Sequence, residues 1–143
     1  LMIATEGYES VAVVGDTLVG MARNAGVTGV VTDGLVRDLD GLEQIGIPVF
    51  AAGVSPASPQ KDGPGTIGLP IVLGGLAIAA GDLVLADAEG VVVVPRAEIA
   101  AVAAALAEVR AKEAQSDAAV RAGAKQPGWL AERLARPDIR WVE

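Results

Sequence analysis

Over its first fifty residues the chain alternates short apolar runs with segments of helical spacing, and this alternation restricts its fold more than any other feature. Residues 1–5 and 28–32 have the apolar composition of short strands. Between them, Leu18, Met21, Ala22 and Ala25 recur at helical spacing, and Gly26 stands where a glycine often ends a helix, which predicts a helix over residues 15–25. A short helix over residues 40–44 and a strand over residues 48–51 are expected next. This order of elements predicts an α/β fold with short crossovers.

The next part of the chain predicts an irregular segment and a set of hairpins. Residues 53–70 are rich in both Pro and Gly, and an irregular stretch of this length in a compact domain is usually functional or lies at an interface. Short apolar runs separated by Gly- and Asp-containing turns then predict consecutive hairpins. The expected strands are residues 71–73, 76–78, 83–85 and 91–94.

A long helix is expected to close the fold. After Pro95, apolar residues at helical spacing predict an amphipathic helix that begins at Glu98 and continues to Gly123. Its expected apolar face carries Ile99, Val102, Leu106 and Val109. Because no linker separates these parts, we expect a single domain over residues 1–143, with residues 96–143 as its C-terminal helical part.

The charge and composition of the chain exclude several classes of function. A net charge of -7 and a pI near 4.5 argue against a protein that binds nucleic acid or an anionic membrane surface. No uninterrupted apolar run is long enough for a membrane span, and we expect a cytoplasmic protein. The chain has no Cys and no His, so a bound metal must be held by oxygen atoms. Oxygen ligands favour Mg²⁺ or Mn²⁺.

The first candidate site is Gly15-Asp16-Thr17-Leu18, at the expected start of a helix. A small residue at a helix start exposes backbone N–H groups, and these groups together with the helix dipole favour a bound anion. A carboxylate of the size of pyruvate, or an enolate oxygen, would fit there. The plainer interpretation, which spacing alone favours, is an ordinary cap in which Asp16 caps its own helix.

The second candidate site is the pair Arg37-Asp38, which follows an expected strand and the Asp33-Gly34 turn. Such a pair lies at a sheet edge, where α/β proteins often have their sites. Arg37 offers a planar fork that suits a carboxylate, and Asp38 offers a hard oxygen ligand. From spacing alone, a solvent-exposed ion pair of little energetic consequence is the commoner outcome.

Three other features have a functional and a plain interpretation. Residues 61–65 could cover a substrate, although a loop that shapes an interface is the commoner role. Residues 87–90 could supply a carboxylate to a metal, although Asp and Gly at these positions suit a hairpin turn. Trp129 and Trp141 are expected to anchor packing near the end of the sequence.

Taken in order, these segments resemble the RraA-like family, which includes 4-hydroxy-4-methyl-2-oxoglutarate aldolase and 4-carboxy-4-hydroxy-2-oxoadipate aldolase. The resemblance spans nearly the whole sequence, and the ordered set of motifs is more specific than any one of them. It rests on Gly15-Asp16-Thr17-Leu18, residues 29–38, 46–50, 74–75, 81–82 and 87–95, and Pro127-Gly128-Trp129-Leu130. Members of this family usually carry a further N-terminal segment, which we expect this sequence to lack.

The resemblance implies a fold and a set of residue roles. The fold is a swivelling β/β/α-type sandwich, assembled as a homotrimer or homohexamer with active sites between subunits. By motif, Asp38 coordinates Mg²⁺ or Mn²⁺, and Asp16 holds a metal-bound water. Arg37 and the amides of Gly15 to Leu18 bind the pyruvyl part of the substrate. A neighbouring subunit is expected to contribute a carboxylate, for which Glu89 is only a weak candidate.

The resemblance also implies an activity. A class II aldolase of this type cleaves 4-hydroxy-2-oxo acids to pyruvate and a 2-oxo acid, and its enolate chemistry would also decarboxylate oxaloacetate. Some members of the family are instead regulators that bind a ribonuclease E-type enzyme without chemistry of their own, and this alternative stays open. Other members are named as demethylmenaquinone methyltransferases, but the sequence has no G-x-G-x-x-G loop after a strand.

Overall fold

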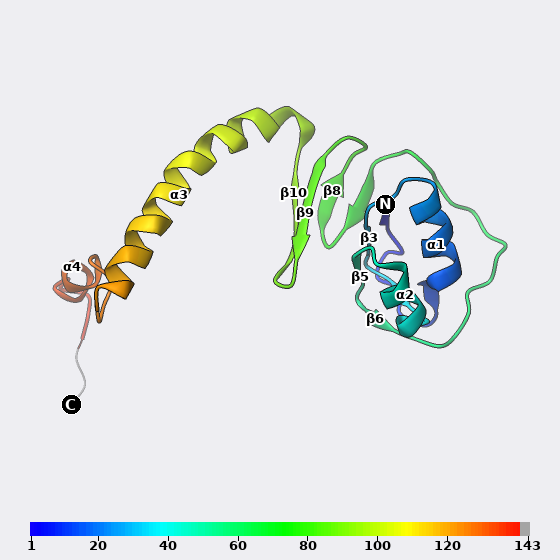
Figure 1. Cartoon of the computed structure of the whole chain (residues 1–143), viewed down its shortest axis with the longest axis horizontal. Helices are drawn as coiled ribbons and strands as arrows, with labels where there is room; N and C mark the ends of the chain where they lie inside the picture. The colour runs from blue at the N-terminus through cyan, green and yellow to red at the C-terminus, as the bar shows by residue number, and fades with distance from the viewer. Residues whose placement is uncertain (141–143) are drawn as a thin grey trace. The chain divides into compact units, whose positions relative to one another are not determined.

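The computed structural model describes residues 1–140, and the chain divides into two compact units, one up to Pro95 and one from Arg96 onward (Figure 1). Every described strand lies in the first unit, and the second unit is helical. The α/β fold predicted from the sequence is confirmed, with small sheets and a long helix near the C-terminal end. Whether the two units form one domain stays a prediction.

Two parallel sheets form the centre of the first unit. The first sheet has the order β1-β3-β5, with strands Met2–Ile3, Val30–Thr32 and Val49–Phe50. The second has the order β2-β4-β6, with strands Ala12–Val14, Leu35–Val36 and Gly53–Val54. Two strands and a helix therefore repeat along the chain, and each repeat contributes one strand to each sheet. All three strands of the second sheet are absent from the expectation, although they are no shorter than those of the first. β2 and β4 run directly into the Gly15-Asp16 and Arg37-Asp38 motifs, and β6 opens the segment rich in Pro and Gly.

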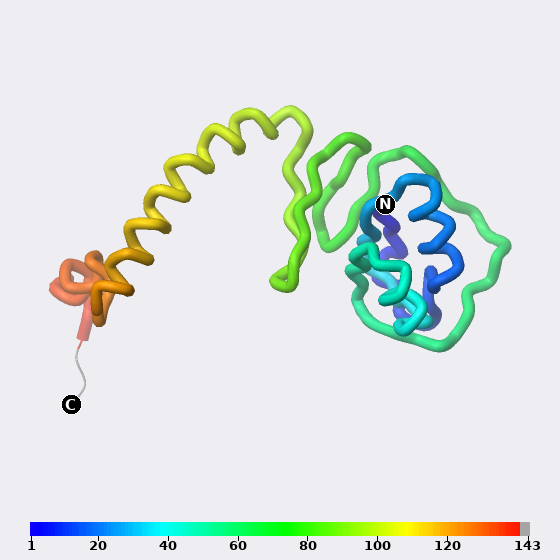
Figure 2. Tube along the Cα trace, viewed as in Figure 1, coloured from blue at the N-terminus to red at the C-terminus, as the bar shows by residue number. Residues whose placement is uncertain are grey.

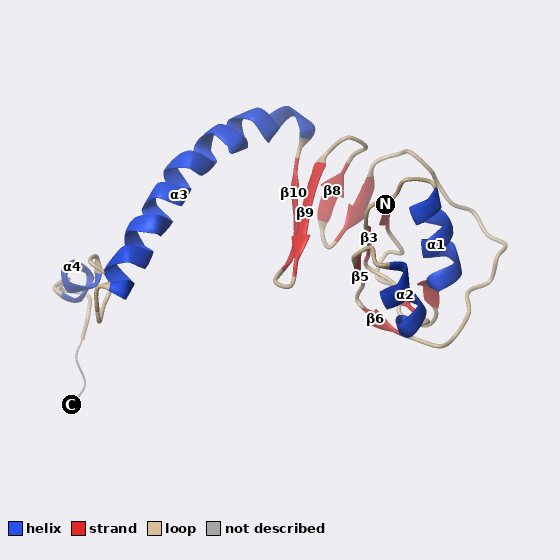
Figure 3. Cartoon of the chain, in the orientation of Figure 1, coloured by secondary structure: helices blue, strands red, loops and turns tan. Residues whose placement is uncertain are grey.

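Two short helices cover these strands and complete the core. α1 (Asp16–Asn24) connects β2 to β3, α2 (Leu39–Ile45) connects β4 to β5, and the two helices contact each other (Figure 3). Val19 of α1, Val30 of β3, Val36 of β4 and Leu42 of α2 form the buried core. Burial of each such side chain stabilises the fold by about 1.5–3 kcal/mol. The unit is thus held together at the junction of both sheets and both helices.

The predicted helix over residues 15–25 is confirmed, but its expected apolar face is partly wrong. Leu18 and Met21 have 55% and 61% of their surface exposed, whereas Val19 is buried. The helix ends where the sequence predicts. Gly26 follows the last turn with φ +92°, a conformation that glycine adopts without strain.

The hairpins predicted in the middle of the chain are also present. β7 (Ile71–Leu73) pairs with β8 (Leu76–Ile78), and β9 (Leu83–Asp87) pairs with β10 (Gly90–Val94). Gly74 and Gly75 connect β7 to β8, and both have positive φ, as a type I′ hairpin turn requires. Asp87 Oδ1 accepts a hydrogen bond from the backbone N–H of Glu89, which confirms the plain interpretation of that segment as a turn.

Between β6 and β7 the chain runs as a long loop over residues 55–70, without helix or strand (Figure 2). Most of its side chains are exposed, and Ile67 is fully exposed. Its first residues are nevertheless fixed, because Ser55 N–H donates to Val36 O and Ala12 N–H donates to Ala57 O. This loop therefore starts beside the second sheet.

The second unit consists of the short 3-10 helix η1 (Arg96–Glu98), α3 (Ile99–Arg121) and α4 (Leu130–Leu134). The long helix predicted from Glu98 to Gly123 is confirmed, but none of its residues is buried. Trp129 is 63% exposed, so its expected role as a packing anchor is wrong, and Trp141 lies outside the described residues. Among the described residues, no helix is both long and apolar enough to cross a membrane.

Candidate active site at the ends of three parallel strands

The carboxyl ends of β2, β4 and β6 meet at one edge of the second sheet. The chain leaves β2 into Gly15 and α1, leaves β4 into Arg37 and Asp38, and leaves β6 into the loop that contains Ser58. Because the strands are parallel neighbours, the segments that follow them lie side by side. Arg37 N–H donates to Val14 O at 3.1 Å, which extends the pairing of β2 and β4 up to the site.

The start of α1 has the features of an anion site. Gly15 is the N-cap residue and supplies no side-chain hydrogen bond, so backbone N–H groups of the first turn face outward. Asp16 Oδ1 accepts hydrogen bonds from the N–H of Thr17 at 2.5 Å and from its hydroxyl at 3.2 Å. The Asp16 side chain therefore bonds to the first turn of α1, as the capping interpretation expects. Asp16 is however the first residue of the helix, and Gly15 is the N-cap.

Arg37 and Asp38 form an ion pair between β4 and α2. Arg37 Nε lies 3.1 Å from Asp38 Oδ2, and the side chains are 35% and 44% exposed. At this exposure the pair contributes about 0–1 kcal/mol to stability. Asp38 has φ +60° and ψ +50°, a left-handed conformation in which non-glycine residues are uncommon and which often marks functional sites.

Two glycines allow the charged side chains to approach the helices. A Cβ on Gly15 would overlap Asp38 Oδ2 and lie 2.9 Å from both Cγ and Nε of Arg37. A Cβ on Gly41, in α2, would overlap Asp16 Oδ2 and lie 2.7 Å from its Cβ. Gly41 was not identified from the sequence, although a glycine inside a short helix is a recognisable signal of close packing.

A pocket of about 390 Å³ opens at this edge of the sheet, within the usual size range of small-ligand sites. It brings together Gly15, Thr17 and Leu18 with Arg37, but Asp16 and Asp38 are not among its lining residues. Ser58 and Pro59, which the sequence did not indicate, and Lys61, the first residue of the segment that could cover a substrate, complete it. The lining residues are Ala12, Val13, Val14, Gly15, Thr17, Leu18, Arg37, Ser58, Pro59 and Lys61.

The donor atoms available for a metal are few. Among residues 1–140 no three Asp or Glu side chains gather closely enough to form a metal cluster. Asp38 supplies one carboxylate beside the pocket. Mg²⁺ commonly keeps several waters and takes only one or two protein carboxylates, so this donor set fits Mg²⁺ or Mn²⁺ in its chemistry. Glu89 lies in the β9–β10 turn and does not line the pocket.

Asp33, in the turn between β3 and β4, has a structural role that the sequence did not reveal. Its Oδ1 accepts hydrogen bonds from the backbone N–H and the hydroxyl of Thr5, and its Oδ2 accepts one from Gly7 N–H. Burial acts to raise the pKa of Asp33, but these hydrogen bonds outweigh it and hold the pKa below its usual range. Asp33 thus ties the end of β1 to the sheet that carries β3.

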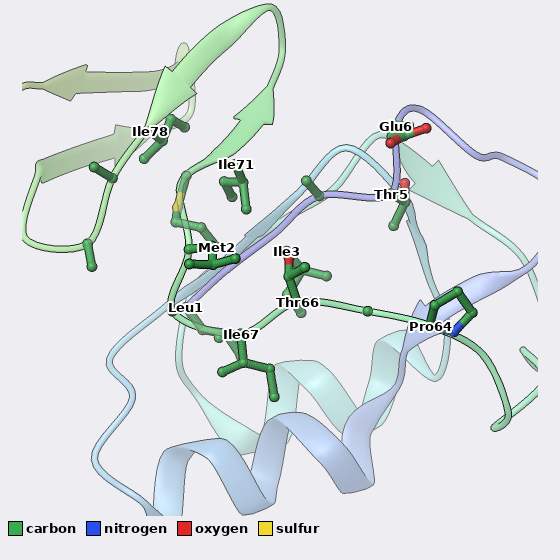
Figure 4. A pocket seen from close by; sticks show the side chains of 16 residues that line it. Leu1, Met2, Ile3, Thr5, Glu6, Pro64, Thr66, Ile67, Ile71 and Ile78 are labelled. Atoms are coloured by element: carbon green, nitrogen blue, oxygen red, sulfur yellow. The ribbon is translucent and has the colours of Figure 1, made fainter.

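A larger pocket of about 870 Å³ lies between β1, the β7–β8 hairpin and the loop (Figure 4). Figure 4 shows the apolar side chains of Met2, Ile3, Ile67, Ile71 and Ile78 around it. Glu6 is the one acidic side chain among its lining residues, and no Lys or Arg side chain is among them. It is an uncovered apolar surface, separate from the pocket at the strand ends.

The sequence and this arrangement can be compared with those of known proteins. A sequence model of the RraA-like group, described as Aldolase/RraA, matches residues 1–93. The chain belongs to the RraA-like family. This match covers the two parallel sheets, the candidate site and nearly all of the hairpins, so the resemblance inferred from the motifs is confirmed.

Individual RraA-like relatives carry two kinds of description. A Halalkalibacterium halodurans protein, whose name proposes it as a 4-hydroxy-4-methyl-2-oxoglutarate aldolase, is 36% identical over 85% of this chain and 57% of its own length. The Streptomyces coelicolor protein RraAS2, described as an unusual member of the RNase ES inhibitor RraA family, has a similar structure. It is 28% identical with a TM-score of 0.75, over 82% of this chain and 60% of its own.

A third relative is an uncharacterized protein from Pseudomonas syringae pv. tomato str. DC3000. Its structure is 29% identical with a TM-score of 0.76, over 87% of this chain and 62% of its own length. The chain thus spans about six tenths of the length of the RraA-like proteins that it matches.

Proposed function

We propose that the protein is a divalent-metal-dependent class II aldolase that cleaves 4-hydroxy-2-oxo acids to pyruvate and a 2-oxo acid. The observation that carries this proposal is the convergence of the α1 amides and Arg37 on one pocket, with Asp38 beside it. These groups can hold an anion, stabilise a developing oxyanion and bind a hard metal ion. The aldolase name of the Halalkalibacterium halodurans relative supports the same chemistry.

The roles follow from the position of each group. The first-turn amides of α1 bind the substrate carboxylate, which the positive end of the helix dipole favours. The Arg37 guanidinium donates to the 2-oxo oxygen, where negative charge develops when the C3–C4 bond breaks. Asp38 would hold Mg²⁺ or Mn²⁺, which when bound supplies Lewis acidity to the 2-oxo acid.

Cleavage of the C3–C4 bond also requires two proton transfers. When the C3–C4 bond breaks, its electron pair stays with C3 in the enolate of pyruvate, and the 4-hydroxyl group loses its proton as C4 becomes a carbonyl. C3 then accepts a proton. The chain has no His, so we assign to Asp16 the task of orienting a water that accepts the proton of the 4-hydroxyl group and gives a proton to C3. The same enolate would form in oxaloacetate decarboxylation, which we expect as a side activity.

A pyruvate-release assay tests the proposal. The purified protein is given a panel of 4-hydroxy-2-oxo acids and oxaloacetate, with Mg²⁺, with Mn²⁺ and after metal removal by a chelator. We expect pyruvate from at least one 4-hydroxy-2-oxo acid, and only with added metal. Pyruvate release from none of the acids, or equal release in excess chelator, would contradict the proposed mechanism.

The second candidate function is a regulator that binds a ribonuclease E-type enzyme, which the likeness to RraAS2 favours. Size-exclusion chromatography with a purified ribonuclease of this type separates the two functions, since a regulator co-elutes with it whether or not Arg37 is substituted. We also propose a homotrimer or homohexamer in the cytoplasm, with no nucleic-acid or membrane partner.

A further inference from the structure

No residue of α3 is buried, although helices in proteins take most of their stability from packing of an apolar face. Residues 99–107 of this helix are uncharged and are mostly alanine. Larger apolar side chains interrupt the alanines and form what we call the α3 stripe, which consists of Ile99, Val102, Leu106 and Val109. Three of the four, Val102, Leu106 and Val109, are exposed. The helix therefore presents apolar side chains that lack a packing partner within the described residues.

The spacing of the α3 stripe is that of a two-helix coiled coil. Its successive members are three, four and three residues apart, which is the alternation of a and d positions in a heptad repeat. They therefore lie on one side of the helix. The pattern ends after two heptads, because Glu113 and Ser116 occupy the next two positions on that side. The stripe thus fits a contact that is confined to the first half of α3.

The α3 stripe is complementary to itself when two copies of the helix run antiparallel. The order a, d, a, d becomes d, a, d, a when it is reversed, so every a residue meets a d residue of the second copy. Ile99 then faces Val109, Val102 faces Leu106, and the same two layers recur across a two-fold axis. A shift by one heptad would place Glu113 opposite Val102. A single antiparallel register therefore makes all four layers apolar.

Charged residues beside the stripe favour the antiparallel direction. Glu98 precedes the stripe and Lys112 follows it, both at heptad position g on the same edge of the helix. These edges meet in an antiparallel pair, so Glu98 of each copy lies opposite Lys112 of the other. Lys112 Nζ lies 2.7 Å from Glu108 Oε1 of its own helix, but the side chain is mostly exposed and can also reach a second carboxylate. In a parallel pair Glu98 would instead lie opposite Ala103.

Small residues flank the centre of the stripe on both edges. They are Ala105 on the edge of Lys112 and Ala103 on the other edge, and small side chains at a contact let two helix axes approach closely. One like-charged pair arises in this register, between Arg110 and Arg96 of the second copy. Arg96 precedes α3 and belongs to η1, so this pair lies at the end of the contact.

We propose that the α3 stripe is an interface with a second copy of this chain, in which two α3 helices pack antiparallel about a two-fold axis. Such a contact joins copies in pairs, and where the copies are also joined in threes it links two trimers into a hexamer. The inference does not depend on the proposed function.

Multi-angle light scattering on two matched variants tests the interface. The unchanged protein should contain an even number of chains. Leu106→Glu places a charge in two central layers and should halve the molar mass of the assembly, with the helix content checked by circular dichroism. Ala104→Glu adds the same charge on the opposite face of α3 and should leave the molar mass unchanged. An odd number of chains in the unchanged protein, or equal molar masses for the two variants, would overturn the inference.

A thiol crosslink tests the direction of pairing in the intact assembly. The chain has no Cys, so a single substitution supplies one thiol in each copy. The two copies of residue 103 lie beside the axis of an antiparallel pair, but on opposite edges of a parallel one. A short bismaleimide should therefore join Ala103→Cys copies into a species of twice the chain mass on a denaturing gel, and should leave Ala104→Cys copies single. Single chains from Ala103→Cys, or equal joining of both variants, would refute the antiparallel contact.

Discussion

Gly15 lies so close to Arg37 that a Cβ on Gly15 would be 2.9 Å from both Cγ and Nε of the arginine. Real Cβ atoms essentially never approach another heavy atom to this distance. The start of α1 and the end of β4 can therefore hold this arrangement only while residue 15 has no side chain. The two motifs found separately in the sequence are in this way parts of one packed unit.

The first prediction follows from this contact. Gly15→Ala should displace Arg37 and Asp38 while the fold is kept, because residue 15 has an extended backbone that alanine also adopts. A displacement of about 1 Å in such a group can lower turnover on the order of 10²-fold. Circular dichroism should be unchanged and pyruvate release strongly reduced. Gly29→Ala, where the added Cβ meets nothing closer than 3.4 Å, is the matched control, and full activity of Gly15→Ala would show that the contact is not needed.

The second prediction concerns the planar fork of Arg37. An ammonium cannot reproduce the directional donors of a guanidinium, so Arg37→Lys should lose turnover on the order of 10²–10³-fold. Arg23→Lys, on the same unit but outside the pocket, should behave like the unchanged protein. Near-normal turnover of Arg37→Lys would mean that Arg37 serves only its ion pair with Asp38.

The sequence revealed the order of elements better than the layers they form. The strands of the β1-β3-β5 sheet were expected because Val30, Val31 and Thr32 and their neighbours form apolar runs. The second sheet was not, because its strands, although equally short, adjoin the Gly15-Asp16 and Arg37-Asp38 motifs or the segment rich in Pro and Gly, and were hidden by them. Since that sheet carries the site, the motifs could be recognised but not placed side by side.

The candidate site was predictable only where a residue's chemistry differs from its neighbours. Arg37 and Asp38 are conspicuous after a short apolar run, and they lie at a strand end as expected. Ser58 and Lys61 reach the pocket because Ala57 bonds to Ala12, forty-five positions away in sequence, and no local pattern encodes that contact. The role of Gly41 is visible only in the structure, where a Cβ at this position would overlap Asp16 Oδ2.

The third prediction concerns the metal. Asp38→Asn should abolish metal-dependent pyruvate release and leave the fold intact, since the side chain is 44% exposed and asparagine tolerates the left-handed backbone. Asp40→Asn, an exposed residue in the first turn of α2, is the control and should keep the activity. Thermal unfolding of both variants should match that of the unchanged protein. Unaltered metal dependence in Asp38→Asn would assign the metal to other residues.

The fourth prediction concerns stability in acid. The pKa of Asp33 is lower in the folded chain than its usual unfolded value of about 3.9, so the ionised carboxylate stabilises the fold above that pH. This stabilisation is lost as the pH falls through the folded pKa. Asp33→Asn should lower the free energy of unfolding at pH 7 by about 1 kcal/mol, a value reduced for solvent screening.

Urea unfolding at a series of pH values measures this effect. The difference between Asp33→Asn and the unchanged protein should be constant from pH 7 to about pH 5 and should shrink below pH 4 or so, where the carboxylate is protonated. Asp62→Asn, in the exposed loop, is the control, and its free energy of unfolding should equal that of the unchanged protein at every pH of the series. A pH-independent difference would mean that the shape of the side chain matters and not its charge.

The last prediction concerns assembly and rests on the exposed apolar residues of the loop and its surroundings. Val54, Ile67 and Leu69 are 57%, 100% and 61% exposed, and Ile67 and Leu69 line the apolar pocket beside β1. A monomer would leave this surface in water, whereas a second copy of the chain would bury it. We therefore predict a homotrimer or a hexamer of two trimers, joined partly through this loop.

Ile67→Glu should shift the protein toward smaller species, because it places a charge where an apolar contact is needed. Gln60→Glu adds the same charge to the same loop without removing an apolar side chain and should leave the assembly unchanged. Multi-angle light scattering distinguishes these species, and a clean monomer that releases pyruvate at a normal rate would refute a site shared between subunits.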